Sequence, residues 1–132
     1  MSKEIVLEWL QDTANTLFKK DIKAHLNLIS KDVSLTGIPG YENIDYNSWS
    51  AQCTHEFADD LITNVNYVGL IILSSDDSRI MFKTLEIVEA TNGSKIPRGI
   101  EAVIQKETDG VWRLIKERVL TDDEARQDGL LR

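Results

Sequence analysis

The sequence predicts a single α+β domain in which three helices cover one face of a curved antiparallel sheet. Apolar residues recur with the 3.6-residue period of helices over the first 62 residues, and with the two-residue period of strands from 65 to 120. Short turn signals separate the strands, so they form a meander. Helices segregated from a meander define the α+β class. A length of 132 residues fits one domain, 1–132.

The helical half contains three helices and an early strand. A long first helix is predicted over 3–20, and Asp21 is placed to cap a shorter second helix that ends near Ser30. A short strand is expected at 32–38, followed by a loop. The apolar spacing then predicts a third helix over 48–62.

Four long strands follow, which brings the expected total to about five. Asn92-Gly93 and Asp109-Gly110 are two-residue hairpin signals, and each separates two β-rich segments. The last residues, about 121–132, are polar and acidic, and we expect them to form a frayed tail. The strands are predicted at 65–74, 79–90, 96–107 and 111–120.

Charge and cysteine content limit the partners. The chain has 22 acidic and 15 basic residues, a net charge of -7 and a pI near 4.8, whereas a nucleic-acid-binding domain needs a basic surface. We therefore expect no nucleic acid and no anionic membrane as partner. No apolar segment reaches the ~20 residues of a membrane span, and no signal-peptide pattern opens the chain, so a cytoplasmic protein is expected. Cys53 is the single cysteine, which excludes a disulfide within the chain and a cysteine-cluster zinc site.

The most reactive-looking stretch is QCTHEFADD, residues 52–60. His55 and Asp59 are four residues apart and can bind a metal from one helix. On a helical projection, however, both lie away from the apolar side, and two ligands on a solvated face make a weak site. We interpret the cluster as a solvated helix face and expect no metal, with a metal site or a subunit contact as alternatives.

The order of several segments resembles one known superfamily. The segments that carry the resemblance are LFKKD at the end of the first helix, KDV at the start of the early strand, GYENIDYNSW before the third helix and DGVWRLIKERV in the last hairpin. In these the chain resembles the nuclear transport factor 2-like superfamily, in its SnoaL-like and ketosteroid-isomerase-like branch. The resemblance implies a cone-shaped, curved antiparallel sheet wrapped around the N-terminal helix, with a cavity between them.

The resemblance does not carry over the best-known catalytic residues. The isomerase's oxyanion tyrosine falls at Thr13, its general-base aspartate at Gly37, and its protonated aspartic acid near Ala102 or Ile104. Histidine-based dehydration is disfavoured, because both histidines are expected in helices away from the sheet. The Asp–Arg–Asp set of the epoxide hydrolases is also missing. A single-acid mechanism like that of the polyketide cyclases remains, with Glu in place of Asp.

Two glutamates are the candidate catalytic residues. The family pattern places the faces carrying Glu86, Glu117 and Arg98 toward the cavity, and burial raises the pKa of a carboxyl group into the range of a general base. Arg98 would instead keep such a carboxylate ionised. The alternative is a cross-strand Glu–Arg pair in solvent, which contributes little energy.

The other candidates are ligand-binding residues. Thr13 lies on the apolar face of the first helix, where its hydroxyl either orients a ligand carbonyl or bonds to the carbonyl four residues back. Cys53 either packs in the core or lines the pocket. His25 is interpreted as a boundary histidine with one hydrogen bond. The full expected set is Thr13, Tyr46, Trp49, Cys53, Thr84 and Arg98.

These inferences predict a cofactor-independent protein that binds a small apolar or polyketide-like molecule. An isomerase-like or cyclase-like enzyme is one version of such a protein. The rival is a non-enzymatic dimerisation or interaction module whose cavity is plugged by its own side chains. A pocket of ~300 Å³ or more favours ligand binding. We also expect a homodimer, because the uncovered face of the sheet is predicted to carry Trp112 and Leu114.

Overall fold

The computed structural model describes residues 2–131 and confirms the α+β fold. One five-stranded sheet is combined with four helices, one more than predicted. The helices are α1 (Ser2–Phe18), α2 (Ile22–Leu26), α3 (Tyr46–Ala58) and α4 (Asp122–Gln127). The strands are β1 (Ile29–Thr36), β2 (Ile62–Ser75), β3 (Arg79–Ala90), β4 (Lys95–Lys106) and β5 (Trp112–Val119).

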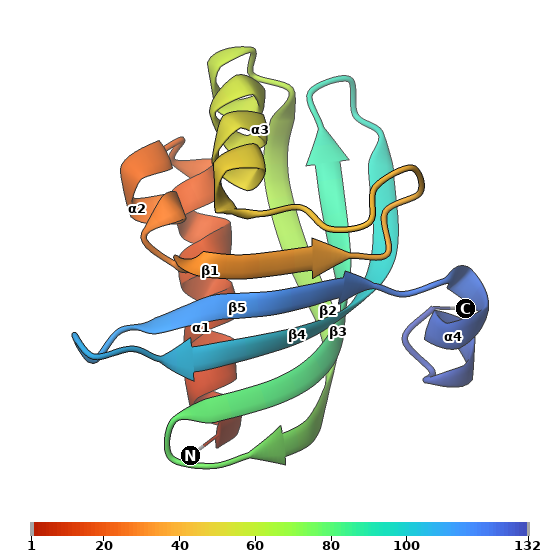
Figure 1. Ribbon diagram of the computed structural model, residues 1–132. Helices are drawn as coiled ribbons and strands as arrows, with labels where there is room; N and C mark the ends of the chain where they lie inside the picture. Colours follow the sequence, from red (N-terminus) through yellow and green to blue (C-terminus); the bar gives the residue numbers. More distant parts are fainter. Residues whose placement is uncertain (1, 132) are drawn as a thin grey trace.

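The sheet has the order β1-β5-β4-β3-β2. The predicted meander β2 to β5 is antiparallel throughout, whereas β1 joins the edge of β5 in parallel. Register shifts interrupt the β2–β3 pairing at three places, and such bulges increase local twist and bend a strand. The sheet therefore curves around α1, with β1, β5 and β4 running across the long β2 and β3 (Figure 1).

Local caps explain where the helical half differs from the prediction. Asp45 accepts a hydrogen bond from the backbone N–H of Ser48, so α3 begins at Tyr46 rather than at 48. The helix ends at Ala58, and Asp60 adopts a left-handed conformation (φ 53°), so the predicted helix over 48–62 is four residues too long at its C-terminal end. The early strand starts at Ile29, which also shortens the predicted second helix.

The hydrophobic core lies between α1 and the concave face of the sheet. Trp9 and Leu10 of α1 meet the inward residues of β3, β4 and β5. Its fully buried side chains include Val6, Ile80, Phe82, Ala102, Ile104 and Leu114. Within the described part of the chain, no helix combines the length and apolar character needed to cross a membrane.

The expected frayed tail is wrong, because residues 122–127 form the additional helix α4. Thr121 caps it by accepting from the N–H of Glu124, and Ala125 is buried against Gly99 of β4. The tail lies on the side of the sheet opposite α1 (Figure 1). Lys83 on that side is held by the carboxylate of Asp128 at 2.8 Å. The polar sequence of this C-terminal segment therefore reflects ion pairing across the outer face of the sheet.

A bulge in β5 overturns one ground for the predicted dimer. Ile104 pairs with Leu114 and Val103 pairs with Lys116, so Ile115 is an extra residue in the strand. Strict alternation along β5 would place Leu114 and Glu117 on opposite faces of the sheet. The bulge turns both side chains to the inward face, and Leu114 is 1% exposed. Leu114 therefore belongs to the core rather than to an outer apolar patch. Homodimer formation stays a prediction.

Candidate functional site

A cavity of about 320 Å³ lies between α1, α2, α3 and the concave face of the sheet. Its walls are predominantly apolar and aromatic, and its polar side chains come from both the strands and the helices. The aromatic and aliphatic lining includes Trp9, Leu17, Ile29, Trp49, Phe57, Ile62, Val65, Val88, Ile96 and Leu114. Concave, mostly apolar cavities with a few polar groups are typical small-molecule sites.

A row of three polar side chains crosses three neighbouring strands. In the register of the sheet, Tyr67 of β2 pairs with Glu86 of β3, and Glu86 pairs with Arg98 of β4. Arg98 Nε and Nη2 each lie 3.0 Å from Glu86 Oε1, and the Tyr67 hydroxyl donates to Glu86 Oε2 at 3.3 Å. Both oxygens of the Glu86 carboxylate are thereby bound, and its charge is balanced by a guanidinium.

Glu117 of β5 lies in the same cavity and has no such partner. Glu117 is 5% exposed as a residue. No hydrogen bond or ion pair joins its carboxyl group to any other residue between 2 and 131. Burial, reinforced by the negative charge of Glu86 and opposed by Arg98, raises the pKa of Glu117 to about 8. At neutral pH Glu117 is therefore mostly protonated, and its O–H is a donor available to a ligand.

Three further ionisable side chains on the helices face this cavity. Burial raises the pKa of Glu56, although Arg98 opposes that change. Burial, assisted by Glu56, raises the pKa of the Cys53 thiol to about 12, so the thiolate needed for nucleophilic attack is scarce at neutral pH. Burial lowers the pKa of His25, which is thus a neutral imidazole. Cys53 therefore lines the wall without acting as a nucleophile.

Both histidines lie in helices, as predicted, but His25 is not remote from the sheet, because it shares the cavity with strand residues. It comes from helix α2 as predicted, but it is 6% exposed, lines the cavity and packs its ring at 5.3 Å from that of Phe57. Its Nδ1 lies 2.8 Å from the hydroxyl of Thr16, and the ring also bonds to the backbone of Thr13, so His25 is a buried histidine rather than the boundary residue predicted. His55 behaves as expected of a solvated face: it is exposed and pairs with Asp59 at 3.1 Å.

The structure brings together six of the eight sequence-predicted site residues. Around the cavity lie Thr13, Trp49, Cys53, Glu86, Arg98 and Glu117. The Thr13 hydroxyl donates to the Trp9 carbonyl at 2.9 Å, which is the structural alternative, and its oxygen lone pairs remain for a ligand donor.

Tyr46 and Thr84 do not line the cavity. Tyr46 is the first residue of α3, which starts two residues earlier than predicted, and it faces an outer groove beside β1. Thr84 shares the inward face of β3 but lies deeper, is fully buried, and donates its hydroxyl to the carbonyl of Gly69. A bulge at Gly69 brings that carbonyl within reach.

Sequence reasoning missed Tyr67, Glu56 and His25 as lining residues. Tyr67 carried a usable signal, because it alternates with Val65 on the inward face of β2 and stands opposite Glu86 in a register set by the hairpin. Glu56 and His25 carried none, since a polar residue at the edge of an apolar helix face is equally compatible with solvent.

Gly37 occupies the position at which the resemblance places the isomerase's base, and the structure explains why no side chain fits there. Its φ is +87°, and a Cβ would lie 2.4 Å from the backbone oxygen of Val119. We expect Gly37→Ala to reduce the free energy of unfolding by ~2 kcal/mol or more in urea denaturation. Gly40→Ala is the matched control, because Gly40 has φ +89° but no atom within 4 Å of the point that a Cβ would occupy. Equal losses in the two variants would contradict the steric explanation.

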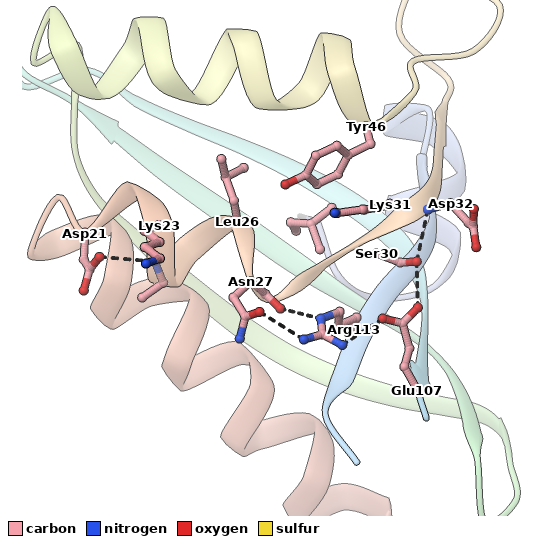
Figure 2. A pocket seen from close by; sticks show the side chains of 12 residues that line it. Asp21, Lys23, Leu26, Asn27, Ser30, Lys31, Asp32, Tyr46, Glu107 and Arg113 are labelled. Atoms are coloured by element: carbon pink, nitrogen blue, oxygen red, sulfur yellow. Dashed lines mark hydrogen bonds and ion pairs between the residues drawn. The ribbon is translucent and has the colours of Figure 1, made fainter. Parts of the chain in front are cut away.

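A larger groove of about 940 Å³ lies outside the cone, beside α2 and β1 (Figure 2). Arg113 is its central charged residue, and it donates to the Asn27 carbonyl at 2.7 Å and to Glu107 and Asp109 at 2.9 Å. Ser30 donates to Glu107 at 2.8 Å. Since these groups satisfy one another, the groove has the character of a structural clamp, and the smaller inner cavity is the better candidate site.

This combination of a bent sheet, an enclosed N-terminal helix and an inner cavity defines the nuclear transport factor 2-like, or cystatin-like, fold. No family model matches the sequence, and no curated protein matches it. Solved structures do match. An NTF-2-like protein of unknown function from Shewanella oneidensis MR-1 superposes with a TM-score of 0.74 at 10% identity, over 90% of this chain and 98% of that one.

Two further structures carry the same fold. A protein of unknown function with a cystatin-like fold from Nostoc punctiforme PCC 73102 has a TM-score of 0.68 at 16% identity, covering 89% and 88% of the two chains. ActVI-ORFA from Streptomyces coelicolor has a TM-score of 0.67 at 14% identity, covering 92% and 97%. At such identities the likeness establishes the fold, while the chemistry has to be argued from the cavity itself.

Proposed function

We propose that the cavity binds a small, largely apolar molecule and that its two glutamates catalyse a cofactor-independent proton transfer on that molecule. The observation that carries this proposal is the carboxyl group of Glu117, which opens onto an apolar cavity and has no hydrogen-bonding partner among the described residues, although the residue is only 5% exposed. A carboxyl group that faces so apolar a cavity is largely desolvated, and its oxygens are left to whatever the cavity holds.

The protonation states define the roles. Glu117 is the acid at neutral pH, because burial keeps it protonated, and its O–H can donate to a carbonyl oxygen of the ligand. Glu86, paired with the guanidinium of Arg98, is the base that accepts a proton from the carbon next to that carbonyl. The C–H electron pair then forms the enol double bond as the Glu117 proton moves to oxygen. Return of a proton to the same or another carbon completes exchange or isomerisation.

The rival function is a non-enzymatic interaction module with a filled cavity. The volume of about 320 Å³ lies at the lower end of the range for small-molecule pockets, which favours ligand binding over a plugged interior. The paired state of Glu86 and Arg98 also fits a static role, but the carboxyl group of Glu117, which faces the cavity without a partner among the described residues, fits a ligand site better than a filled interior.

The test is deuterium exchange at the α-carbon of 2-tetralone, a neutral bicyclic ketone, followed by proton NMR in D₂O. Wild-type protein is expected to accelerate exchange over buffer, and both Glu117→Gln and Glu86→Gln are expected to lose about 100-fold or more of that acceleration. Glu101→Gln is the matched control, because Glu101 lies on the outer face of the sheet, paired with Arg118 at 3.2 Å.

Circular dichroism at the assay temperature checks that each variant is folded. Exchange by the two cavity variants at the wild-type rate would refute the proposal. So would wild-type exchange no faster than buffer with 2-tetralone and with the smaller ketone 1-indanone, while either ketone saturates the cavity.

A further inference from the structure

We propose that the cavity selects uncharged molecules with a hydrogen-bond acceptor and rejects organic anions, because the guanidinium of Arg98 is already paired with Glu86 and the carboxyl group of Glu117, which has no partner among the described residues, is left to donate. The inference rests on the proposed function in taking the inner cavity as the ligand site. It adds the charge class of the ligand, which the fold does not determine.

The charges around the cavity are unbalanced toward acid. Among the described lining residues there are three carboxyl groups, Glu56, Glu86 and Glu117, and one guanidinium, that of Arg98. Arg98 is committed to Glu86 through two contacts of 3.0 Å. An entering carboxylate or phosphate would meet no uncompensated positive charge and would lie beside acidic groups, so its desolvation would not be offset.

At the polar end of the cavity a cation gains less than the number of acids suggests, because Glu86 is already paired with Arg98 and the Glu117 carboxyl group holds a proton. Arg98 already provides positive charge there, and its attraction for the carboxylate of Glu86 is satisfied. A second cation would have to displace the proton of Glu117 and approach the guanidinium. An uncharged ligand requires neither step.

The donor and acceptor inventory identifies the group that a ligand should present. The Tyr67 hydroxyl gives its proton to Glu86, so it can only accept. The Thr13 hydroxyl gives its proton to the Trp9 carbonyl. Glu117 has a proton that it gives to no other described residue. Of these three groups only Glu117 offers a ligand a donor, so a ligand that binds to it must present an acceptor such as a carbonyl, ether or ester oxygen.

Binding of such a ligand must depend on the protonation of Glu117. The groups that face it are Glu86 from β3, Arg98 from β4, Tyr67 from β2, Cys53 and Glu56 from α3 and His25 from α2. The pKa of Glu117 is about 8 and lies between pH 7 and 9, whereas burial raises that of Cys53 to about 12 and that of Tyr67 well above its usual value. Burial also raises the pKa of Glu56, so the variant Glu56→Gln is needed to separate the two carboxyl groups. A ligand that accepts from the Glu117 O–H is bound by the protonated form alone.

The experiment compares three naphthalene probes of nearly equal shape: 2-acetylnaphthalene, 2-naphthoate and 2-naphthylmethylammonium. Dissociation constants are measured by NMR on ¹⁵N-labelled protein from the indole N–H signals. Trp9 and Trp49 line the cavity, and Trp112 lies outside it as an internal reference. We expect the ketone to bind at least tenfold more tightly than either ion at pH 7.

The pH dependence provides the second readout. Affinity for the ketone is expected to be about tenfold lower at pH 9 than at pH 7, following the protonated fraction of Glu117. Glu117→Gln keeps a donor that does not titrate, so it should bind the ketone with equal affinity at both pH values. Glu101→Gln should retain the wild-type pH dependence, because it lies on the opposite face of the sheet.

Three results would overturn the inference: naphthoate binding as tightly as the ketone, the ammonium binding more tightly, or a pH dependence removed by Glu56→Gln rather than by Glu117→Gln. The outcome is separable from that of the proposed function. Ketone binding with the expected pH profile but without deuterium exchange would uphold the ligand class and refute catalysis. Deuterium exchange without selectivity for uncharged ligands would uphold catalysis and refute the ligand class.

Discussion

Glu117→Gln is expected to be more stable than the wild-type protein at pH 8.5, by as much as ~4 kcal/mol, although it removes the proposed acid. The carboxyl group titrates near its ordinary pKa in the unfolded chain, whereas burial raises the pKa of Glu117 in the folded protein to about 8. Between these values the folded state holds a proton that the unfolded state has released. Wild-type stability therefore falls as pH rises, by at most ~1.4 kcal/mol per pH unit.

The direction in which stability changes with pH determines the pH values at which the two proteins are compared. The stabilising contribution of the Glu117 proton is fully present below pH 4.5, declines through neutral pH, and is lost once pH exceeds about 8. Urea denaturation of both proteins at pH 5, 7 and 8.5 should give curves that diverge with rising pH. Glutamine cannot ionise, so this part of the slope disappears in the variant.

Glu101→Gln is the control for the loss of one negative charge from a protein of net charge -7. Glu101 lies on the outer face of the sheet and pairs with Arg118, so its removal should give no gain that grows with pH. If the free energies of unfolding of Glu117→Gln and wild type differ by a constant amount from pH 5 to pH 8.5, Glu117 is not the buried acid described above. A gain in stability accompanied by loss of exchange would instead mark a site at which stability is given up for function.

The fold could be predicted to this extent because its signals are local. Alternating apolar residues and the turns at Asn92-Gly93 and Asp109-Gly110 fix strands β3, β4 and β5 to within two residues. The errors arose where the determinant was not local. The bulge at Ile115 depends on how β5 meets β4, and no pattern within the strand reveals it. The tail looked unstructured because its apolar contact, Ala125 on Gly99, is made across the outer face of the sheet.

The distinction between local and non-local determinants also holds for the site. Glu86 and Arg98 could be assigned to the inward face from alternation and the family pattern, and they are paired as the hairpin register requires. The solvent-exposed version of that pair was wrong, because Glu86 is 8% exposed. Thr84 shares that inward face, but depth along a strand depends on the packing of α1 and β2, and the sequence does not report it.

Removing the guanidinium of Arg98 is expected to give the second large effect. In Arg98→Met the carboxylate of Glu86 would stay buried with only the Tyr67 hydroxyl as a donor. Breaking a buried pair on one side costs ~3–5 kcal/mol. The side chain of Arg98 is 39% exposed, so solvent offsets part of the loss, and we expect ~3 kcal/mol at pH 7.

The double variant Arg98→Met/Glu86→Gln separates charge from packing. Removing the unpaired charge should restore most of the stability lost in the single variant, whereas a loss caused by packing would persist. Urea denaturation of the four members of the cycle at pH 7 tests this expectation.

A stability of Arg98→Met within ~0.5 kcal/mol of wild type at pH 7 would contradict the buried ion pair. The same variant bears on function, because Arg98 opposes the effects of burial and of Glu86 on Glu117. Without it, the pKa of Glu117 should rise further, and the alkaline fall in ketone affinity should move above pH 8. A shift in the opposite direction would mean that Arg98 stabilises the protonated form, and the assignment of Glu117 as the free donor would have to be abandoned.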